Sequence, residues 1–354
     1  MPRKNYIFLL AALLLALTAC NRKAARTTIR RPDFNADSAY AFVEKQLAFG
    51  PRVPNSEGHT RCAVWLIEQL RAYGAQVELQ KGNMPDYRGN NQQVYNIIAH
   101  FPAADSLTAA DASRPRILLC AHYDTRPWCD EEEDYSDRFY NVPGANDGAS
   151  GVAVLLEVAR QLGLRKKCLN DSINDQMVND QMVNDQMVNT PVDIVFFDCE
   201  DMGTPRFYTG QQRENTWCLG SQLWAADYTN DQMVNDRMVH PRYAYGILLD
   251  MVGAPDALFP REYYSSRYAA NYQELIWRRA AELGHGRFFS NKPSYPITDD
   301  HYYINLAGIP CVDIIHYDPN ATGFAHWWHT RNDDISNISP TTLRAVGETI
   351  LSLL

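Results

Sequence analysis

The segment VDIVFFDCEDMG (Val192–Gly203) is an apolar run that ends in carboxylates. Its β-branched and aromatic residues predict a buried strand. Asp198, Glu200 and Asp201 stand at the end of that strand. Neighbouring carboxylates in a sheltered site repel each other and lose hydration, so they stay ionised only beside a positive group. The segment therefore predicts a buried strand and a cation close to its end.

Strand and helix patterns alternate along the rest of the chain. The predicted strands lie at 75–80, 94–101, 116–122, 192–198, 245–253 and 309–315, and the predicted helices lie at 37–49, 59–74, 150–163, 219–227, 272–283 and 339–354. This alternation predicts an α/β fold, a three-layer αβα sandwich with helices on both faces of a mixed, mostly parallel central sheet. We expect a single catalytic domain over 34–354.

The chain is acidic, and this limits its partners. Among 354 residues, 42 are Asp or Glu and 33 are Lys or Arg, which gives a formal net charge of −9. Without a basic patch we expect no nucleic-acid partner. A negative protein instead attracts cationic groups, such as the free amino terminus of a peptide.

Residues 1–19 are predicted to be a lipoprotein signal peptide, because Arg3 and Lys4 precede a short apolar run at 6–19. The segment LTAC at 17–20 resembles a bacterial lipobox, which implies that Cys20 is lipidated. Residues 20–33 would then be a tether. We expect an exported, lipid-anchored protein on the periplasmic face of the inner or outer membrane, with the lipid as its only membrane contact. The alternative is an ordinary secretory signal in which Cys20 is incidental.

Two repeat segments interrupt the α/β pattern. NDQMV occurs three times in tandem at 174–188, and NDQMVNDRMV follows at 230–239. A five-residue period matches neither a helix nor a strand. We interpret the insertions, at 170–190 and 229–240, as expanded surface loops, with a partner-binding loop as the alternative.

Five short motifs bring acids and histidines to the ends of predicted strands. They are AHYD (His122, Asp124), GANDGASG (Asn146, Asp147), FFDCED (Asp198, Glu200, Asp201), LLDMVG (Asp250) and HWWHT (His326, His329). Functional groups of an open α/β sheet collect at the carboxyl ends of its strands. A catalytic zinc ion takes three His or carboxylate ligands and keeps one position open. The motifs therefore predict a metal site with a nearby base for hydrolysis or acyl transfer.

These motifs, together with LGS (219–221), TDDHYY (298–303) and WHT followed by DD (328–334), resemble the zinc aminopeptidase superfamily. Within it they are most similar to the animal-type glutaminyl-peptide cyclotransferases, or glutaminyl cyclases, and their bacterial relatives. The resemblance covers roughly 34–354 apart from the repeat segments.

The resemblance implies roles for individual residues. The zinc ligands would be Asp147, Asp201 and His329, and Glu200 would be the general base and acid. An acidic network around the substrate amine would be completed by Asp250 and Asp299. The pocket would be lined by Trp328, Ile297, Ile315 and Phe324. Close by would lie His122 and Asp124, and the Asp147–Gly148 bond would be cis.

The implied activity is zinc-dependent conversion of an N-terminal glutamine of peptides or proteins to pyroglutamate, with release of ammonia and one Zn²⁺ per chain. One alternative is a two-zinc aminopeptidase, in which His122 and Asp250 hold a second Zn²⁺ and Glu200 activates water. The aromatic wall at Trp328 favours the cyclase, since it suits a flat glutamine side chain. A second alternative is an inactive peptide-binding lipoprotein, against which the intact Glu200 argues.

Three positions depart from the pattern of relatives. Asp201 stands where many have Glu, which makes this ligand one methylene shorter. Thr298 stands where animal enzymes have an amide side chain. Asp313 stands where they have a histidine, which indicates different surroundings for the site.

Overall fold

The computed structural model describes residues 31–103, 114–174, 190–230, 233–234, 237–238, 241–321 and 323–354. Within it, Pro32–Leu354 forms one compact unit. The predicted signal peptide, Cys20, the tether up to residue 30 and most of both repeat insertions lie outside the described residues. Among the described helices, none combines the length and the apolar character needed to cross a membrane.

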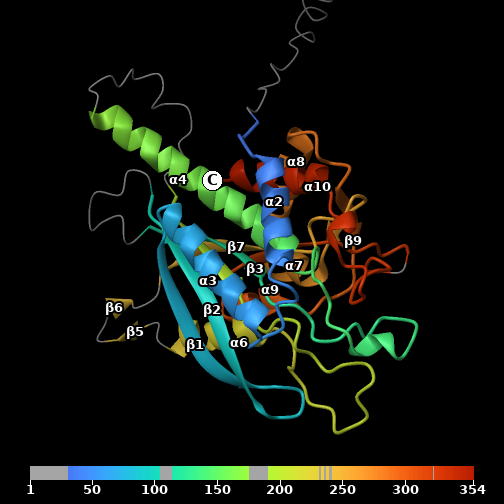
Figure 1. Ribbon diagram of the computed structural model, residues 1–354. Coiled ribbons are helices and arrows are strands. Elements are labelled where there is room, and N and C mark those ends of the chain that lie inside the picture. Colours follow the sequence, from blue (N-terminus) through green and yellow to red (C-terminus); the bar gives the residue numbers. More distant parts are fainter. Residues whose placement is uncertain are drawn as a thin grey trace, which may run out of the picture. The chain divides into compact units, whose positions relative to one another are not determined.

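A six-stranded sheet forms the middle of this unit (Figure 1). In spatial order its strands are β1 (Gln76–Pro85), β2 (Asn91–Phe101), β4 (Val192–Phe197), β3 (Arg116–His122), β7 (Tyr243–Asp250) and β10 (Cys311–Ile315). The last four run parallel to one another, whereas β2 is antiparallel to both of its neighbours. This is the mixed, mostly parallel sheet that the sequence predicts.

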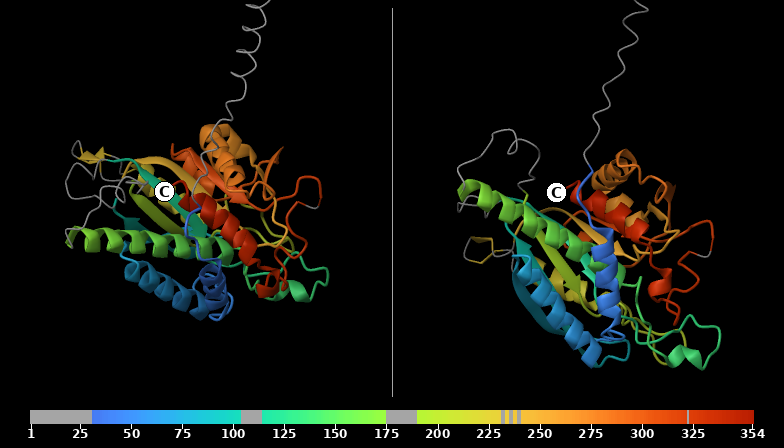
Figure 2. Two further views of the ribbon diagram at one scale, coloured as in Figure 1. Left: turned by 90° about the horizontal axis from the view of Figure 1, so that it is seen from above. Right: turned by 45° about the horizontal axis from the view of Figure 1, so that its top comes forward.

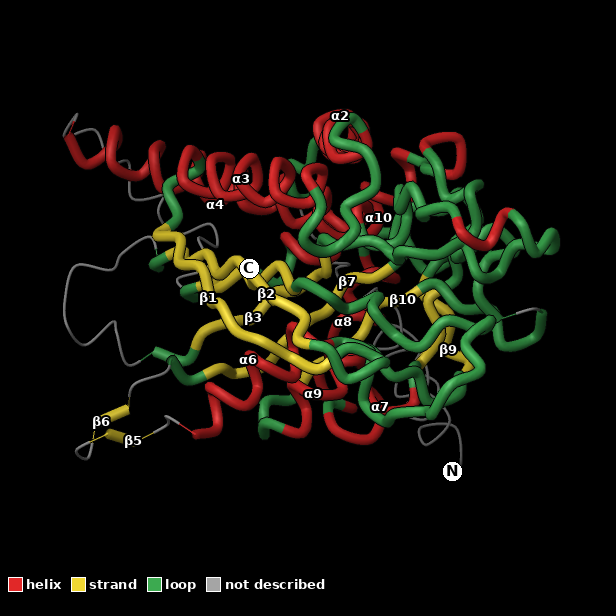
Figure 3. Tube along the Cα trace, turned by 60° about the horizontal axis from the view of Figure 1, so that its bottom comes forward, coloured by secondary structure: helices red, strands yellow, loops and turns green. Residues whose placement is uncertain are grey.

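Helices cover both faces of the sheet, as Figure 3 shows. One face carries α2 (Ala36–Leu47), α3 (Glu57–Ala72), α4 (Ala149–Asn174) and α10 (Pro340–Leu351). The other carries α6 (Leu219–Asn230), α7 (Tyr263–Tyr268) and α9 (Asp300–Leu306), while α8 (Ala270–Glu282) packs against α10 and β10. The predicted three-layer αβα sandwich is therefore confirmed.

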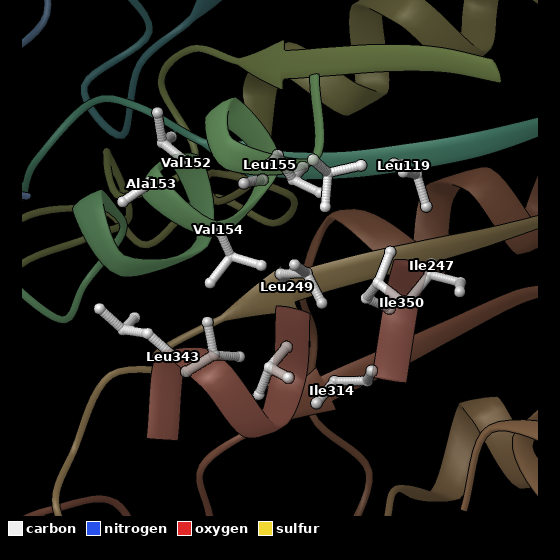
Figure 4. Close-up of a cluster of buried hydrophobic side chains, with 14 of the residues drawn as sticks. Leu119, Val152, Ala153, Val154, Leu155, Ile247, Leu249, Ile314, Leu343 and Ile350 are labelled. Atoms are coloured by element: carbon white, nitrogen blue, oxygen red, sulfur yellow. The ribbon is translucent and has the colours of Figure 1, made fainter. Parts of the chain in front are cut away.

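Successive side chains of a strand point to opposite faces of the sheet, so a strand that is buried on both faces contributes to two hydrophobic clusters. In β4, Ile194 and Phe196 join the large cluster under α4 and α10, whereas Val195 and Phe197 join the cluster under α6. Figure 4 shows side chains of α4, β7 and α10 meeting in the larger cluster. Because side chains alternate across a strand, an all-apolar strand packs against both helical layers at once.

Helix α4 runs further than predicted, from Ala149 to Asn174 instead of ending at 163, so it enters the first predicted insertion (Figure 2). Gly163 lies inside the helix, where an added Cβ would clash with the Tyr73 carbonyl oxygen. The glycine permits this close approach, and its cost within a helix is only about 1 kcal/mol.

Several short elements were not predicted. They are α7, α9, the parallel pair β8 (Phe259–Arg261) and β9 (Phe289–Pro293), the antiparallel pair β5 (Met233–Val234) and β6 (Arg237–Met238), and the 3₁₀ turns η2 (Asp137–Phe139) and η3 (Ile335–Asn337). Segments of two to seven residues are too short to show a hydrophobic period.

Candidate active site

The predicted site residues meet at the carboxyl edge of the parallel strands. His122 ends β3 and Asp250 ends β7, and the pair Glu200–Asp201 follows β4. Asp147 precedes α4, and His329 lies on the loop between β10 and α10. All six residues are buried.

Asp147, Asp201 and His329 form a group suited to a metal ion. Nε2 of His329 lies 3.1 Å from Oδ1 of Asp201 and 3.4 Å from Oδ2 of Asp147. Ligand atoms of the three residues all lie within 4.8 Å of one another. The second carboxylate oxygen of Asp201 is buried and has no hydrogen-bond partner within the described part of the chain, although buried polar atoms are normally paired. Two carboxylates, one imidazole and this unpaired oxygen fit a Zn²⁺ ion.

A buried ion pair lies behind this group. Arg126 donates two hydrogen bonds to Asp130, at 2.7 and 2.6 Å, and a third to the backbone carbonyl of Asp201 at 3.1 Å. Oδ1 of Asp130 lies 3.7 Å from Nδ1 of His329. The pair therefore contacts two of the three residues of this group. Neither residue was predicted, although their spacing of four residues just after the HYD motif is visible in the sequence.

Asp124 holds the turn that carries the two adjacent acids. Its carboxylate accepts hydrogen bonds from the backbone N–H groups of Glu200, at 3.1 Å, and Asp201, at 3.2 Å. Its Oδ1 also lies 3.5 Å from Nδ1 of His122. Asp124 thus links the ends of β3 and β4. Its predicted place beside the site agrees with this geometry.

His122 joins a second group of possible ligands. Its Nε2 lies 3.0 Å from Oδ1 of Asp147 and 3.2 Å from Oδ1 of Asp250. Asp147 thereby belongs to both groups. The chain therefore supplies ligand atoms for a second ion as well as for the first.

The loop that carries Asp147 is fixed from the other side of the site. Asp333 accepts hydrogen bonds from the N–H groups of Asn146, at 2.8 Å, and Asp147, at 3.1 Å. Oδ1 of Asn146 accepts a hydrogen bond from Gly253, just after β7, at 2.7 Å. The Asp147–Gly148 peptide bond is cis, as the resemblance implies.

A cavity of about 500 Å³ opens beside these residues. Its lining includes all four predicted pocket residues, Trp328, Ile297, Ile315 and Phe324, and the acids Glu200, Asp250 and Asp299. The ring of Trp328 lies 4.4 Å from that of Phe324 and 3.7 Å from the imidazole of His329, between centroids. The pocket therefore has an aromatic wall and an acidic wall.

Further aromatic residues of the pocket were missed by sequence reasoning. Tyr295, Tyr303, Tyr317 and Trp217 also line it. Trp217 lies parallel to His329 at 6.1 Å, with the Arg126 guanidinium 4.5 Å from its ring centroid. These residues come from loops and a short helix, where no periodic pattern marks them.

Two acids of the pocket, Glu200 and Asp299, have raised pKa values. Burial and the neighbouring carboxylate of Asp201 raise the pKa of Glu200 well above its ordinary value. Burial raises the pKa of Asp299 to about 7, with a further contribution from the charge of Asp250. Such values suit groups that exchange protons near neutral pH.

Asp198 and His326 are among the motif residues that do not line the cavity. His326 is exposed on the surface. Asp198 lies 2.8 Å from Nε2 of His59 and accepts a hydrogen bond from the N–H of Tyr95, so it ties the first turn of α3 and strand β2 to the end of β4. In HWWHT, His329 belongs to the group formed with Asp147, and His326 does not. In FFDCED, Asp201 belongs to that group, whereas Asp198 and Glu200 do not.

The comparisons with known proteins agree with this geometry. A model of peptidase family M28 matches residues 96–354. The chain belongs to peptidase family M28. Its similarity to a glutaminyl-peptide cyclotransferase of Bos taurus is 24% identity over 257 residues, which cover 67% of this chain and 61% of the bovine protein. The chain therefore matches less than two thirds of the length of that relative.

Two solved structures are similar to this chain over nearly their whole length. A glutaminyl cyclase of Tannerella forsythia is 42% identical, with a TM-score of 0.76, covering 90% of this chain and 98% of that one. A protein of Parabacteroides distasonis, described as a Zn-dependent exopeptidase, is 41% identical with the same TM-score, covering 92% and 99%. The predicted resemblance to glutaminyl cyclases within a zinc peptidase family is confirmed.

Proposed function

We propose that this M28 protein is a zinc-dependent glutaminyl cyclase that converts the N-terminal glutamine of peptides or proteins to pyroglutamate and releases ammonia. The observation that carries the proposal is the pocket itself. Trp328 stacks beside His329 of the metal group, and three carboxyl groups, those of Glu200, Asp250 and Asp299, line the same cavity. A flat, neutral side chain fits against the indole, and the acids suit an amino group.

The metal would be held by Asp147, Asp201 and His329, with one Zn²⁺ per chain. Bound there, it supplies Lewis-acid polarisation of a carbonyl group. The remaining steps belong to the protein. Glu200 accepts a proton from the substrate α-amino group as the α-nitrogen bonds to the carbonyl carbon of the glutamine side-chain amide. It then returns that proton to the amide nitrogen as the old C–N bond breaks. Asp250 and Asp299 orient the amine and share protons with Glu200.

Metal content and product mass, measured on one sample, test this proposal. We expect one zinc per chain and a product lighter than a glutamine-initiated peptide by the mass of ammonia. Release of the free first residue would overturn it. A folded, zinc-loaded protein that binds such peptides without converting them would support the inactive binder instead.

The two-zinc aminopeptidase is a second candidate, because His122 lies 3.0 Å from Asp147 and 3.2 Å from Asp250. In that enzyme Asp147 would bridge two ions and Glu200 would activate water. Two zinc ions per chain, the second lost in His122→Ala, together with release of free amino acids, would establish it.

We also propose that the enzyme is exported and lipid-anchored through Cys20. The support is the sequence LTAC at 17–20, which follows a short apolar run. Labelled fatty acid should enter the wild-type protein and be absent from Cys20→Ala. Equal labelling of both proteins, or export of an unlabelled wild type, would contradict the anchor.

A further inference from the structure

A row of four buried polar residues leads away from the pocket. It runs from Asp299, which lines the cavity, through Asp313 and His301 to Glu262. Each of the four is at most 3% exposed, and of the four only Asp299 lines the cavity. We call these residues the polar row. They come from three separate places in the chain, namely the start of α7, the start of α9 and strand β10.

Glu262 binds three elements with one carboxylate. It caps α7 by accepting hydrogen bonds from the N–H groups of Tyr264, at 2.8 Å, and Ser265, at 2.6 Å. It also accepts one from the N–H of Ile297, at 3.3 Å, and Nε2 of His301 lies 3.0 Å away. A helix cap is normally Asp, Asn, Ser or Thr. The longer Glu262 caps α7 and also reaches the backbone of the pocket wall.

His301 continues the row toward Asp299. With Nε2 facing Glu262, its Nδ1 faces Asp313, whose Oδ2 lies 3.5 Å away. Polar atoms of Asp299, His301 and Asp313 all lie within 4.8 Å of one another. Both carboxylate oxygens of Asp313 and Oδ2 of Asp299 are buried and lack hydrogen-bond partners among the described residues.

The side chain of Asp299 caps α9 by accepting a hydrogen bond from the N–H of Asp300, and its carboxylate also lies beside His301 and Asp313 of the row. An unpaired buried oxygen costs about 1–3 kcal/mol, so small movements that pair these atoms are favoured. The polar atoms of His301 and Asp313 are within reach, and the orientation of His301 is set by Glu262. Ile297 depends on the same carboxylate through its backbone N–H. The carboxylate of Glu262 thus contacts two supports of the pocket wall, the backbone N–H of Ile297 and the imidazole of His301 beside Asp299.

We propose that Glu262 and His301 are positioning residues, which hold the pocket acid Asp299 and the wall residue Ile297 in the geometry that the reaction needs. The inference rests on the proposed function. A misplacement of about 1 Å in a reacting group can lower the rate on the order of a hundredfold. Loss of the row should therefore lower turnover without removing the metal.

The variant Glu262→Asp separates positioning from folding. Aspartate is a good helix cap, so α7 stays capped, but the carboxylate is one methylene too short for Ile297 and His301. We expect kcat/KM to fall roughly tenfold or more with zinc content unchanged and little loss of thermal stability. Full kcat/KM in Glu262→Asp would overturn the proposal.

His285→Gln is the matched control. Nε2 of His285 lies 2.7 Å from Oε2 of Glu348, and neither residue lines the cavity. The substitution His285→Gln removes a histidine–carboxylate pair similar to that of His301 and Glu262. We therefore expect lower thermal stability with unchanged kcat/KM. A loss of kcat/KM in the control as large as in Glu262→Asp would mean that general destabilisation explains both, and would overturn the positioning role.

A spectroscopic readout separates this inference from the proposed function. The ring-nitrogen NMR signals of His301, assigned by their loss in His301→Gln, should shift in Glu262→Asp, and unshifted signals would overturn the inference even in a protein without turnover. If the wild type releases free amino acids instead of ammonia, the proposed function fails. In that case the rate at which Glu262→Asp releases free amino acids, divided by the wild-type rate, still tests the positioning role.

Discussion

The thiol of Cys218 donates a hydrogen bond to Oε1 of Glu200 at 3.2 Å. Cys218 is fully buried, and its N–H also donates to the backbone carbonyl of Glu200 at 2.8 Å. The start of α6 therefore holds both the backbone and the carboxylate of the proposed general base. Sequence reasoning assigned no role to this cysteine.

Removing this thiol should slow the reaction moderately. We expect Cys218→Ala to lower kcat roughly three- to tenfold, because a neutral hydrogen bond contributes about 0.5–1.5 kcal/mol and about 1.4 kcal/mol corresponds to tenfold. Cys218→Ser should restore most of the rate, since the hydroxyl also donates. Equal rates in the Ala and Ser variants would show that the hydrogen bond does not matter.

His329 and His326 give a clear test of the metal ligands within one motif. His329→Ala should lose zinc and activity together, because three protein ligands leave none to spare. The exposed His326 provides the control, and His326→Ala should keep both. Metal analysis after dialysis distinguishes the two variants, and full zinc occupancy in His329→Ala would exclude it as a ligand.

Substitutions of the adjacent acids Glu200 and Asp201 should have different effects on zinc content and on turnover. Glu200→Gln should keep zinc and lose roughly 10²- to 10⁴-fold in kcat, the usual contribution of a general acid–base group. Asp201→Asn should lose zinc, because it weakens one of three ligands. The opposite result, zinc lost in Glu200→Gln and kept in Asp201→Asn, would reverse the two assignments.

Asp130 should tune the affinity for the metal without touching it. Its carboxylate lies 3.7 Å from Nδ1 of His329 and is paired with Arg126. We expect Asp130→Asn to weaken zinc binding about 10- to 100-fold, the typical effect of losing a group that orients a metal-bound histidine. Competition with a chelator of known affinity measures this, and unchanged affinity would mean that Arg126 alone orients the site.

His100 should make stability depend on pH at the edge of the sheet. Its Nδ1 lies 2.8 Å from Oδ1 of Asp193, and this hydrogen bond raises the pKa of His100 above 6.5, although partial burial opposes it. A raised folded-state pKa gives stability that is complete below the unfolded value and is lost as pH rises through the folded value. Melting temperatures of wild type and His100→Gln should therefore differ most near about pH 5 and converge toward about pH 9. A difference that grows with pH would contradict this sign.

Much of the site could be predicted because a parallel sheet brings its strand ends together. His122, Asp250 and the acids after β4 follow apolar strands, and the carboxyl ends of parallel strands share one edge. The sequence distance between them does not matter once the strands are recognised. The motifs of Asp147 and His329 were also expected at strand ends, and that was wrong, because Asp147 precedes α4 and His329 lies on the loop between β10 and α10. Their roles as ligands are implied by the family resemblance.

The remaining features depend on packing between distant segments. Gly163 stays inside α4, and only the fold shows the backbone of Tyr73 lying close against it. Likewise Arg126 could be read only as a charged loop residue until the fold placed it against Asp201 and Trp217.

The sequence by itself determined the layers of the fold and the acids and histidine that its strands deliver to one edge, because hydrophobic period and strand direction are local properties. Only the tertiary structure decided which residues surround that edge. Cys218, Glu262 and Asp313 reach the site from elements with no shared pattern, and their roles arise from burial and hydrogen bonds that exist only after those elements pack. A buried polar residue orients other groups through its hydrogen-bond partners. When those partners come from distant segments, only the folded chain brings them together.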